Sequence, residues 1–423
     1  MAHRFLPLLA ALLLNAPAPT PPAAAPGAHD TTRPWVMEQA ARAMSAASVG
    51  PLAPRGAVVR QAQAATSRPT AATALRREVF GFVNAGALTD PTVGPASWDF
   101  SLLSTVAYFG LHASPSGALV QNDTGWNVWH SSAASGLLNQ AHASGVRVVL
   151  TVIYQEFPSG PNMCAALDNA ATTAAQLQGQ LLGADGVNID YEGTNVTCPD
   201  GVAARSKVTA FARRLRAAGL GYLSIDTYAS SAGDGGGFFD VPALAGTLDS
   251  LFVMDYDLET SNGPCGACLS PTSPLGGAPT YAWNVARSAQ EYTPWAGQTI
   301  LGFPYYGIKG CVNGPNPGPN APVLPHTFGA DPYASIVTYP SDPNISSWSE
   351  QRDALDPGGQ EPWAGFYSGY ASCWREEYWD DAVSLGHKYD LVNQASFRGA
   401  GMCCATSASV SPIRLTNWLS NLG

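Results

Sequence analysis

The run 185–192 reads Asp-Gly-Val-Asn-Ile-Asp-Tyr-Glu and places polar groups at alternate positions. Because successive side chains of a strand point to opposite faces, Asn188, Asp190 and Glu192 share one face and residues with apolar bodies share the other. Two carboxyls in line are costly to bury, and their proximity raises the pKa of one of them. A carboxyl with a raised pKa can act as a general acid near neutral pH. The alternative is a solvated edge strand with chance acidic residues, but such a strand would not need an apolar opposite face. The run therefore predicts an acid–base site with Glu192 at its open end.

The histidine and cysteine patterns predict neither a nucleophile nor a metal centre. His112, His130 and His142 stand in no Ser or Cys nucleophile motif, and we interpret them as structural. Cys265 and Cys268 have the spacing of metal ligands, but no second such pair and no nearby His pair accompanies them. We therefore expect a protein without a metal or any other cofactor.

Short β-rich apolar runs alternate with helical stretches from residue 77 onward, which is typical of parallel strands joined by crossover helices. The eight runs are 78–85, 104–110, 146–153, 185–192, 222–228, 250–257, 299–307 and 399–405. This pattern predicts an α/β fold, a (β/α)8 TIM barrel in which the run 185–192 ends at the catalytic rim. A doubly wound open sheet is the competing topology, but no Gly-rich phosphate loop follows the first run.

The segments between these runs complete the organisation. The best helical candidates are 134–143, 170–182, 202–218, 281–292 and 380–394. Residues 308–375 are too many for a structureless loop, so they predict a small inserted lobe between strand 7 and the last helix. A bridge between Cys311 and Cys373 would close that lobe.

Charge and the amino terminus bear on partners and compartment. The 423 residues carry 21 Lys and Arg against 31 Asp and Glu, a net charge of −10, which argues against a nucleic-acid partner. Residues 1–25 have the layout of a secretory signal peptide, and residues 26–76 form an Ala/Pro-rich linker or pro-segment before a barrel at 77–423. Eight cysteines and three glycosylation sequons fit export. We expect a secreted monomer, or one in a lysosomal or vacuolar lumen, without a membrane anchor once the signal is removed.

The run DGVNIDYE resembles the DGxDxDxE signature of glycoside hydrolase family 18, and further resemblances follow in the family's order. They cover about residues 78–405 and are closest in character to chitinases and di-N-acetylchitobiase. The matching stretches are Met254–Asp257 for the MxYD element, Ile300–Gly307 for the LGxPxYG element, Tyr378–Leu391 for the final helix and Arg398–Met402 for the eighth strand.

The resemblance implies a retaining hydrolase in which the acetamido oxygen of the substrate, not a protein group, attacks the anomeric carbon. Glu192 would protonate the leaving oxygen and later activate water. Asp190, supported by Asn188, would hold the acetamido N–H and offset the charge of the oxazolinium intermediate, while Tyr256 would bind the acetamido oxygen and Asp257 would position the sugar. The implied substrates are β-1,4-linked oligo- or polysaccharides of N-acetylglucosamine.

Two positions depart from the family pattern. Asn188 stands where many members have Asp, and Cys403 follows Met402 where the family usually has a Trp under the sugar. The second departure keeps open a non-catalytic, chitinase-like sugar-binding protein, and the motifs leave open peptidoglycan or N-glycan cores as substrates. Endo or exo action is likewise open. Further candidate substrate-binding residues are Trp126, Tyr305, Tyr306 and Trp363.

Overall fold

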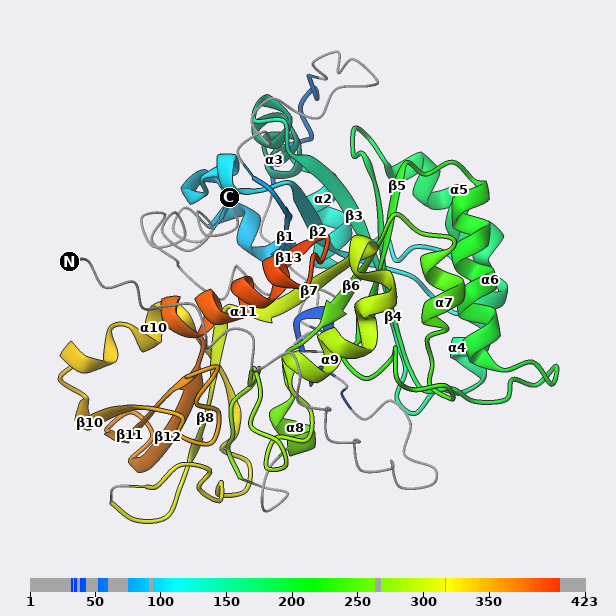
Figure 1. Ribbon diagram of the computed structural model, residues 1–423. Helices are drawn as coiled ribbons and strands as arrows, with labels where there is room; N and C mark the ends of the chain where they lie inside the picture. The colour runs from blue at the N-terminus through cyan, green and yellow to red at the C-terminus, as the bar shows by residue number, and fades with distance from the viewer. Residues whose placement is uncertain are drawn as a thin grey trace, which may run out of the picture.

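Eight parallel strands close into a barrel in which each strand lies beside the next one along the chain, and β13 closes the ring against β1 (Figure 1). The structure is a computed structural model that describes Thr32, Pro34, Trp35 and residues 39–42, 52–59, 75–90, 94–262, 268–315 and 317–403. The barrel strands are β1 (Glu78–Asn84), β2 (Thr105–His112), β3 (Arg147–Gln155), β4 (Gly186–Glu192), β5 (Tyr222–Tyr228), β6 (Ser250–Met254), β7 (Thr299–Pro304) and β13 (Gly399–Cys403). The predicted TIM barrel is confirmed, and the open sheet is excluded because the ring is closed.

Helices follow the strands and lie outside the ring (Figure 1). They are α2 (Thr124–Trp129), α3 (Ser132–Ala143), α4 (Pro161–Asp168), α5 (Ala170–Gln180), α6 (Ala204–Ala217), α7 (Val241–Ala245), α8 (Glu259–Asn262), α9 (Val285–Tyr292) and α11 (Ala382–Gln394). The helix expected at 170–182 is preceded by α4, which begins with Pro at its first turn and ends at Asp168, with Asn169 as its C-cap. Among the described residues, none of the helices has the length and apolar character needed to cross a membrane.

An ion-pair cluster closes the end of the barrel at which the strands begin. Glu78 Oε2 accepts a hydrogen bond from Arg398 Nε at 2.6 Å, and Arg147 Nη1 lies 3.2 Å from Glu78 Oε1. The Arg147 guanidinium also stacks 3.9 Å from the ring centre of Tyr222. Although burial opposes it, Arg398 and Arg147 hold the pKa of Glu78 below its ordinary value. This end is neutralised by its own cations, so the chemistry of the barrel belongs to the opposite, carboxyl end of the strands.

The inserted lobe is an antiparallel sheet of five strands beside the barrel (Figure 1). Its strands are β8 (Tyr306–Cys311), β9 (Gly329–Pro332), β10 (Ile345–Arg352), β11 (Pro362–Ser368) and β12 (Cys373–Trp379), with the short α10 (Tyr333–Ile336) after β9. The expected disulfide joins Cys311 to Cys373 across β8 and β12. The lobe is thus confirmed, and its sheet starts two residues before and ends four residues after the predicted range.

Candidate active site

Strand β4 carries the polar column that the sequence predicts. Asn188, Asp190 and Glu192 are fully buried, although each has a polar side chain. On the opposite face, Tyr191 packs its ring 4.5 Å from that of Phe211 on α6. The alternation therefore sends the apolar bodies to the helices and the polar groups into the barrel.

Gln155, at the end of β3, joins the two carboxyls of the column. Its Nε2 donates a hydrogen bond of 2.6 Å to Glu192 Oε1 and lies 3.5 Å from Asp190 Oδ2. The register of β3 on β4 places Gln155 beside Glu192 at the carboxyl ends of both strands. Gln155 was not among the predicted site residues, because it lies two residues beyond the run 146–153 that was expected as the third strand, and β3 extends to include it.

Strand β5 adds a second polar column that the sequence analysis did not identify. Asn188 Nδ2 donates a hydrogen bond of 2.7 Å to Asp226 Oδ2, and Ser224 Oγ donates one of 2.6 Å to Asn188 Oδ1. Ser224 and Asp226 are both fully buried. Asn188 is thereby fixed by a donor on one side and an acceptor on the other.

Burial dominates the electrostatics of the column. It raises the pKa of Asp190 to about 7, far above the ordinary value of an aspartate. Burial and then the charge of Asp190 raise the pKa of Asp226 well above its ordinary value. The column thus contains carboxyls that stay protonated at pH values where exposed carboxyls are ionised.

The segment after β6 brings Tyr256 and Asp257 to the same end of the barrel. Tyr256 is fully buried, and its pKa lies well above the ordinary value, first because of burial and then because of nearby carboxylates. Those carboxylates are Asp226, Glu192, Asp257 and Asp190. Within the described structure Tyr256 Oη has no hydrogen-bond partner. A phenol that stays protonated with a free hydroxyl can donate to an acceptor on a ligand.

Asp257 is held in a defined orientation. Its backbone has φ +58°, its N–H donates to Thr272 Oγ1 at 3.1 Å, and the hydroxyl of Tyr306 donates to its Oδ1. The ring of Tyr306 meets that of Tyr256 edge to face, with centres 6.5 Å apart. The structure therefore groups Tyr256, Asp257 and Tyr306.

Three other sequence candidates lie apart from this group. The hydroxyl of Tyr305 contacts that of Tyr389 on α11, so this tyrosine packs between the barrel and a covering helix. Trp363 lies on β11 of the lobe and stacks on Tyr378, with ring centres 6.2 Å apart. Trp126, on α2, is half-buried against His130. The partners named here for these three side chains, Tyr389, Tyr378 and His130, belong to the covering helices and the lobe.

The altered eighth strand ends in a buried cysteine. Cys403 is the last residue of β13, pairs with Pro304 of β7, is fully buried and is disulfide-bonded. No aromatic ring is therefore available from this position to stack on a sugar.

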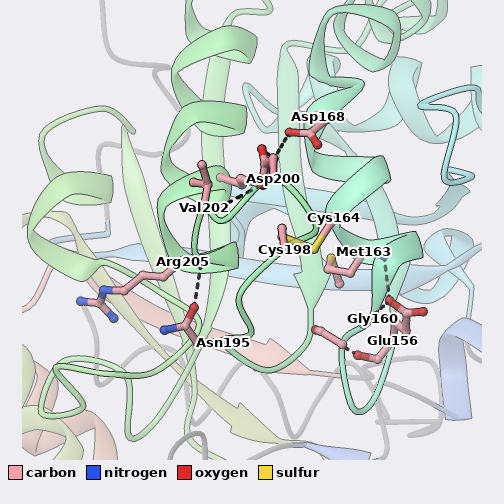
Figure 2. The surroundings of a disulfide bond; sticks show 12 residues. Glu156, Gly160, Met163, Cys164, Asp168, Asn195, Cys198, Asp200, Val202 and Arg205 are labelled. Carbon is pink, nitrogen blue, oxygen red and sulfur yellow. Dashed lines mark hydrogen bonds and ion pairs between the residues drawn. A yellow bond between two sulfur atoms is a disulfide. The ribbon is translucent and has the colours of Figure 1, made fainter.

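The loop that follows Glu192 is fastened to α4 (Figure 2). Figure 2 shows the disulfide between Cys164 of α4 and Cys198 of the loop. Near it in Figure 2, Arg205 N donates to Asn195 Oδ1 at 3.1 Å. Lys207 Nζ also lies 2.6 Å from Asp200 Oδ2. These contacts restrict the segment that begins directly after the candidate acid.

Described residues of the amino-terminal segment reach the loops after β5 and β6. Thr32 Oγ1 donates to Ser230 Oγ at 3.0 Å and accepts from Ser230 N at 2.9 Å. Trp35 Nε1 donates to Glu259 Oε1 at 2.6 Å, and the Trp35 ring lies 5.0 Å from that of Phe328. Part of the segment interpreted as a linker or pro-segment thus lies at the rim of the candidate site.

No group of three or more His, Cys, Asp or Glu side chains in the described part of the chain is arranged to hold a metal ion. The site is built from carboxyls, amides and phenols, which suits proton transfer and hydrogen bonding to a polar ligand.

Comparison with known proteins decides the family. The sequence model of glycosyl hydrolases family 18 matches residues 166–403, more than half of the chain. The chain belongs to this family. The match contains the polar column, Tyr256 and Asp257, and it ends at Cys403. None of the curated proteins matches the sequence significantly.

Solved structures of family 18 proteins share the fold. The Ostrinia furnacalis Group IV chitinase is 18% identical, with a TM-score of 0.65 and coverage of 82% of this chain and 99% of that chain. Catalytic domain 2 of the Group II chitinase of the same insect is 18% identical, with a TM-score of 0.64 and coverage of 81% and 95%. An immunomodulatory active chitinase from Trichuris suis is 16% identical, with a TM-score of 0.65 and coverage of 82% and 100%.

Proposed function

We propose that this family 18 protein is a secreted glycosidase that hydrolyses β-1,4 linkages of N-acetylglucosamine-containing glycans by substrate-assisted, retaining catalysis. The observation that carries the proposal is the buried group of Asp190, Glu192 and Tyr256 at the carboxyl end of the barrel. Among the similar structures, the Ostrinia furnacalis Group II domain was solved with a (NAG)5 oligosaccharide and the Group IV chitinase with allosamidin. These ligands support an N-acetylglucosamine oligosaccharide as the ligand of this chain.

The proposed reaction needs no protein nucleophile. The acetamido oxygen of the sugar on the non-reducing side attacks the anomeric carbon of that same sugar. The bond from this carbon to the glycosidic oxygen breaks, and Glu192 gives its proton to the leaving oxygen. Asp190 accepts a hydrogen bond from the acetamido N–H and offsets the positive charge of the oxazolinium ion. Tyr256 donates its free hydroxyl to the acetamido oxygen, and Asp257 positions the sugar. Glu192, now a carboxylate, then takes a proton from the water that opens the intermediate.

Gln155 and Asn188 support these groups. Gln155 orients Glu192 through the 2.6 Å hydrogen bond, and Asn188 connects the column of β4 to Asp226. Tyr306 holds Asp257 through its hydroxyl. Fixed donors and acceptors of this kind favour the charges that develop in the transition state because they need no reorganisation.

The proposal is tested by following product release from chito-oligosaccharides, peptidoglycan and a glycopeptide with one purified sample. We expect product from an N-acetylglucosamine oligomer and none with Glu192→Gln, whose amide cannot protonate a leaving group but can still accept from Gln155. A Glu192→Gln variant within tenfold of the parent would overturn the assigned acid. The substrate with the fastest release identifies the natural glycan class.

A non-catalytic sugar-binding protein is the second candidate, and the absence of a ring at Cys403 favours it. Aromatic stacking is worth about 0.5–1.5 kcal/mol beyond area burial, so its loss weakens sugar binding. Saturable binding of an oligosaccharide without any product would select this candidate.

We also propose that the protein acts as a monomer outside the cell or in a lysosomal or vacuolar lumen. The disulfides Cys164–Cys198 and Cys311–Cys373 suit an oxidising compartment. The predicted signal peptide, residues 1–25, lies outside the described residues. Sequencing the amino terminus of the mature protein tests its removal, and light scattering tests the monomer.

A further inference from the structure

The mechanism above leaves Asp226 without a role, although it lies in the middle of the candidate site. Its side chain is fully buried, and only Oδ2 is hydrogen-bonded, as the acceptor from Asn188 Nδ2 at 2.7 Å. Oδ1 has no hydrogen-bond partner in the described structure. An unpartnered carboxylate oxygen at this depth is costly unless it carries a proton that a neighbouring group can accept.

Asp190 lies next to Asp226. In the register of β4 on β5, Asn188 pairs with Ser224 and Ile189 with Ile225, so Asp190 and Asp226 are the next residues on the two strands. Both side chains belong to the inward polar columns, and the charge of Asp190 acts directly on Asp226. Asp190 Oδ1 also lacks a hydrogen-bond partner in the described residues. Two neighbouring buried carboxyls cannot both ionise without a large electrostatic cost.

We propose that Asp190 and Asp226 share a single proton and that Asp226 thereby acts as a positioning residue for Asp190. The inference rests on the proposed function, in which Asp190 holds the acetamido group. Once Asp190 has ionised, Asp190 carries the negative charge and the proton that the pair keeps lies on Asp226 Oδ1. Asn188 selects this arrangement, because its amide N–H occupies Asp226 Oδ2 and Ser224 holds the amide in that orientation.

The groups named around the pair are other acids, an amide and a phenol. Tyr256 faces it from the segment after β6 and stays protonated, with its pKa raised first by burial. Glu192 follows on β4 and is linked to Asp190 through Gln155. Within the described structure no Lys, Arg or His is among the groups that act on Asp226. The pair therefore stabilises one negative charge through a carboxyl O–H rather than through a cation.

The test is the pH profile of kcat on a chito-oligosaccharide for Asp226→Asn. An amide is a weaker donor to a carboxylate than a carboxyl O–H, so Asp190 takes up a proton more readily in the variant. We expect the acid limb of the profile to move to higher pH by about one unit, with a loss of about tenfold in kcat below it. The double variant Asn188→Asp, Asp226→Asn returns a carboxyl to the same space and should move the limb back.

Asp255→Asn is the matched control. Asp255 is equally buried and directly follows β6, but the groups that act on it are Ser288, Lys388 and Glu291, and Asp190 is not among them. Its removal should leave the position of the acid limb unchanged. An acid limb that coincides in the wild type and in a folded Asp226→Asn variant would overturn the proposal. Asp226→Ser repeats the comparison with a smaller side chain if the amide variant does not fold.

A second measurement separates this proposal from the proposed function. If the wild type hydrolyses none of the glycans, the proposed function fails, and the pair is then tested by the number of protons taken up on folding. That number follows from the pH dependence of the free energy of unfolding. At about pH 8 the folded variant Asp226→Asn should take up about one proton fewer than the wild type. An equal count would contradict the shared proton.

Discussion

Asp190→Asn should stabilise the folded protein at neutral pH while it removes the group that holds the acetamido N–H. The pKa of Asp190 is raised to about 7 by burial, against an ordinary value of 3.8. Between pH 4 and 7 the folded state therefore holds a proton that the unfolded chain has lost. Because one pKa unit corresponds to about 1.4 kcal/mol, the wild type loses about 4 kcal/mol of stability as pH rises through this window.

The assay is urea unfolding of the wild type and Asp190→Asn at pH 4.0 and pH 7.5, with the disulfides intact. An amide without partners costs about 1–3 kcal/mol at both pH values, so the difference between the two pH values isolates the charge effect. We expect the free energy of unfolding of the variant, relative to that of the wild type, to be about 4 kcal/mol higher at pH 7.5 than at pH 4.0. Glu350→Gln, which removes an exposed carboxyl of β10, is the control and should show no such gain. A pH-dependent gain below about 1 kcal/mol would refute the argument from burial.

Three further predictions follow from individual contacts. Gln155→Leu removes the hydrogen bond to Glu192, which is worth about 1.5–3 kcal/mol once Glu192 becomes charged as it gives up its proton. The value of kcat/KM should therefore fall about 10- to 150-fold in a folded protein, and a loss of less than about threefold would contradict the role of Gln155. Replacing Cys164 and Cys198 by Ser should lower the free energy of unfolding by about 3–4 kcal/mol, because the bridge spans 34 residues, and an unchanged urea midpoint would argue against it. Cys403→Trp should reduce stability without tightening sugar binding, because Cys403 is fully buried and disulfide-bonded. If calorimetry shows tighter oligosaccharide binding by a well-folded variant, position 403 has room for an aromatic ring beside the sugar.

The barrel could be predicted because each strand is a short apolar run bounded by turns and helices. The column of β4 was predictable for the same reason, since a period of two separates Asn188, Asp190 and Glu192 from their neighbours. Strand β5 has a similar alternation, with Ser224 and Asp226 on one face, but Thr227 follows Asp226 and the run carries no second acidic group to mark it. Only the register of β5 on β4 shows that Asp226 completes the column.

Aromatic residues were the least predictable part of the site. Tyr305 and Tyr306 are adjacent in sequence, yet one packs on α11 and the other holds Asp257, because adjacent side chains diverge. Trp363 belongs to the packing of the lobe sheet, where it stacks on Tyr378. A tryptophan suits a sugar platform and a packed core equally well, so its residue type does not separate the two.

Substrate-assisted catalysis is tested by comparing rates of hydrolysis on two oligosaccharides that differ only in their acetyl groups. Reducing ends released from a fully N-acetylated oligomer and from its de-acetylated counterpart are measured with the wild type and with Glu192→Gln. We expect hydrolysis of the acetylated oligomer alone, and its loss in Glu192→Gln, because the acetamido oxygen is the nucleophile and Glu192 the acid. Equal rates on both oligomers, or no hydrolysis of either by a folded wild type, would contradict it.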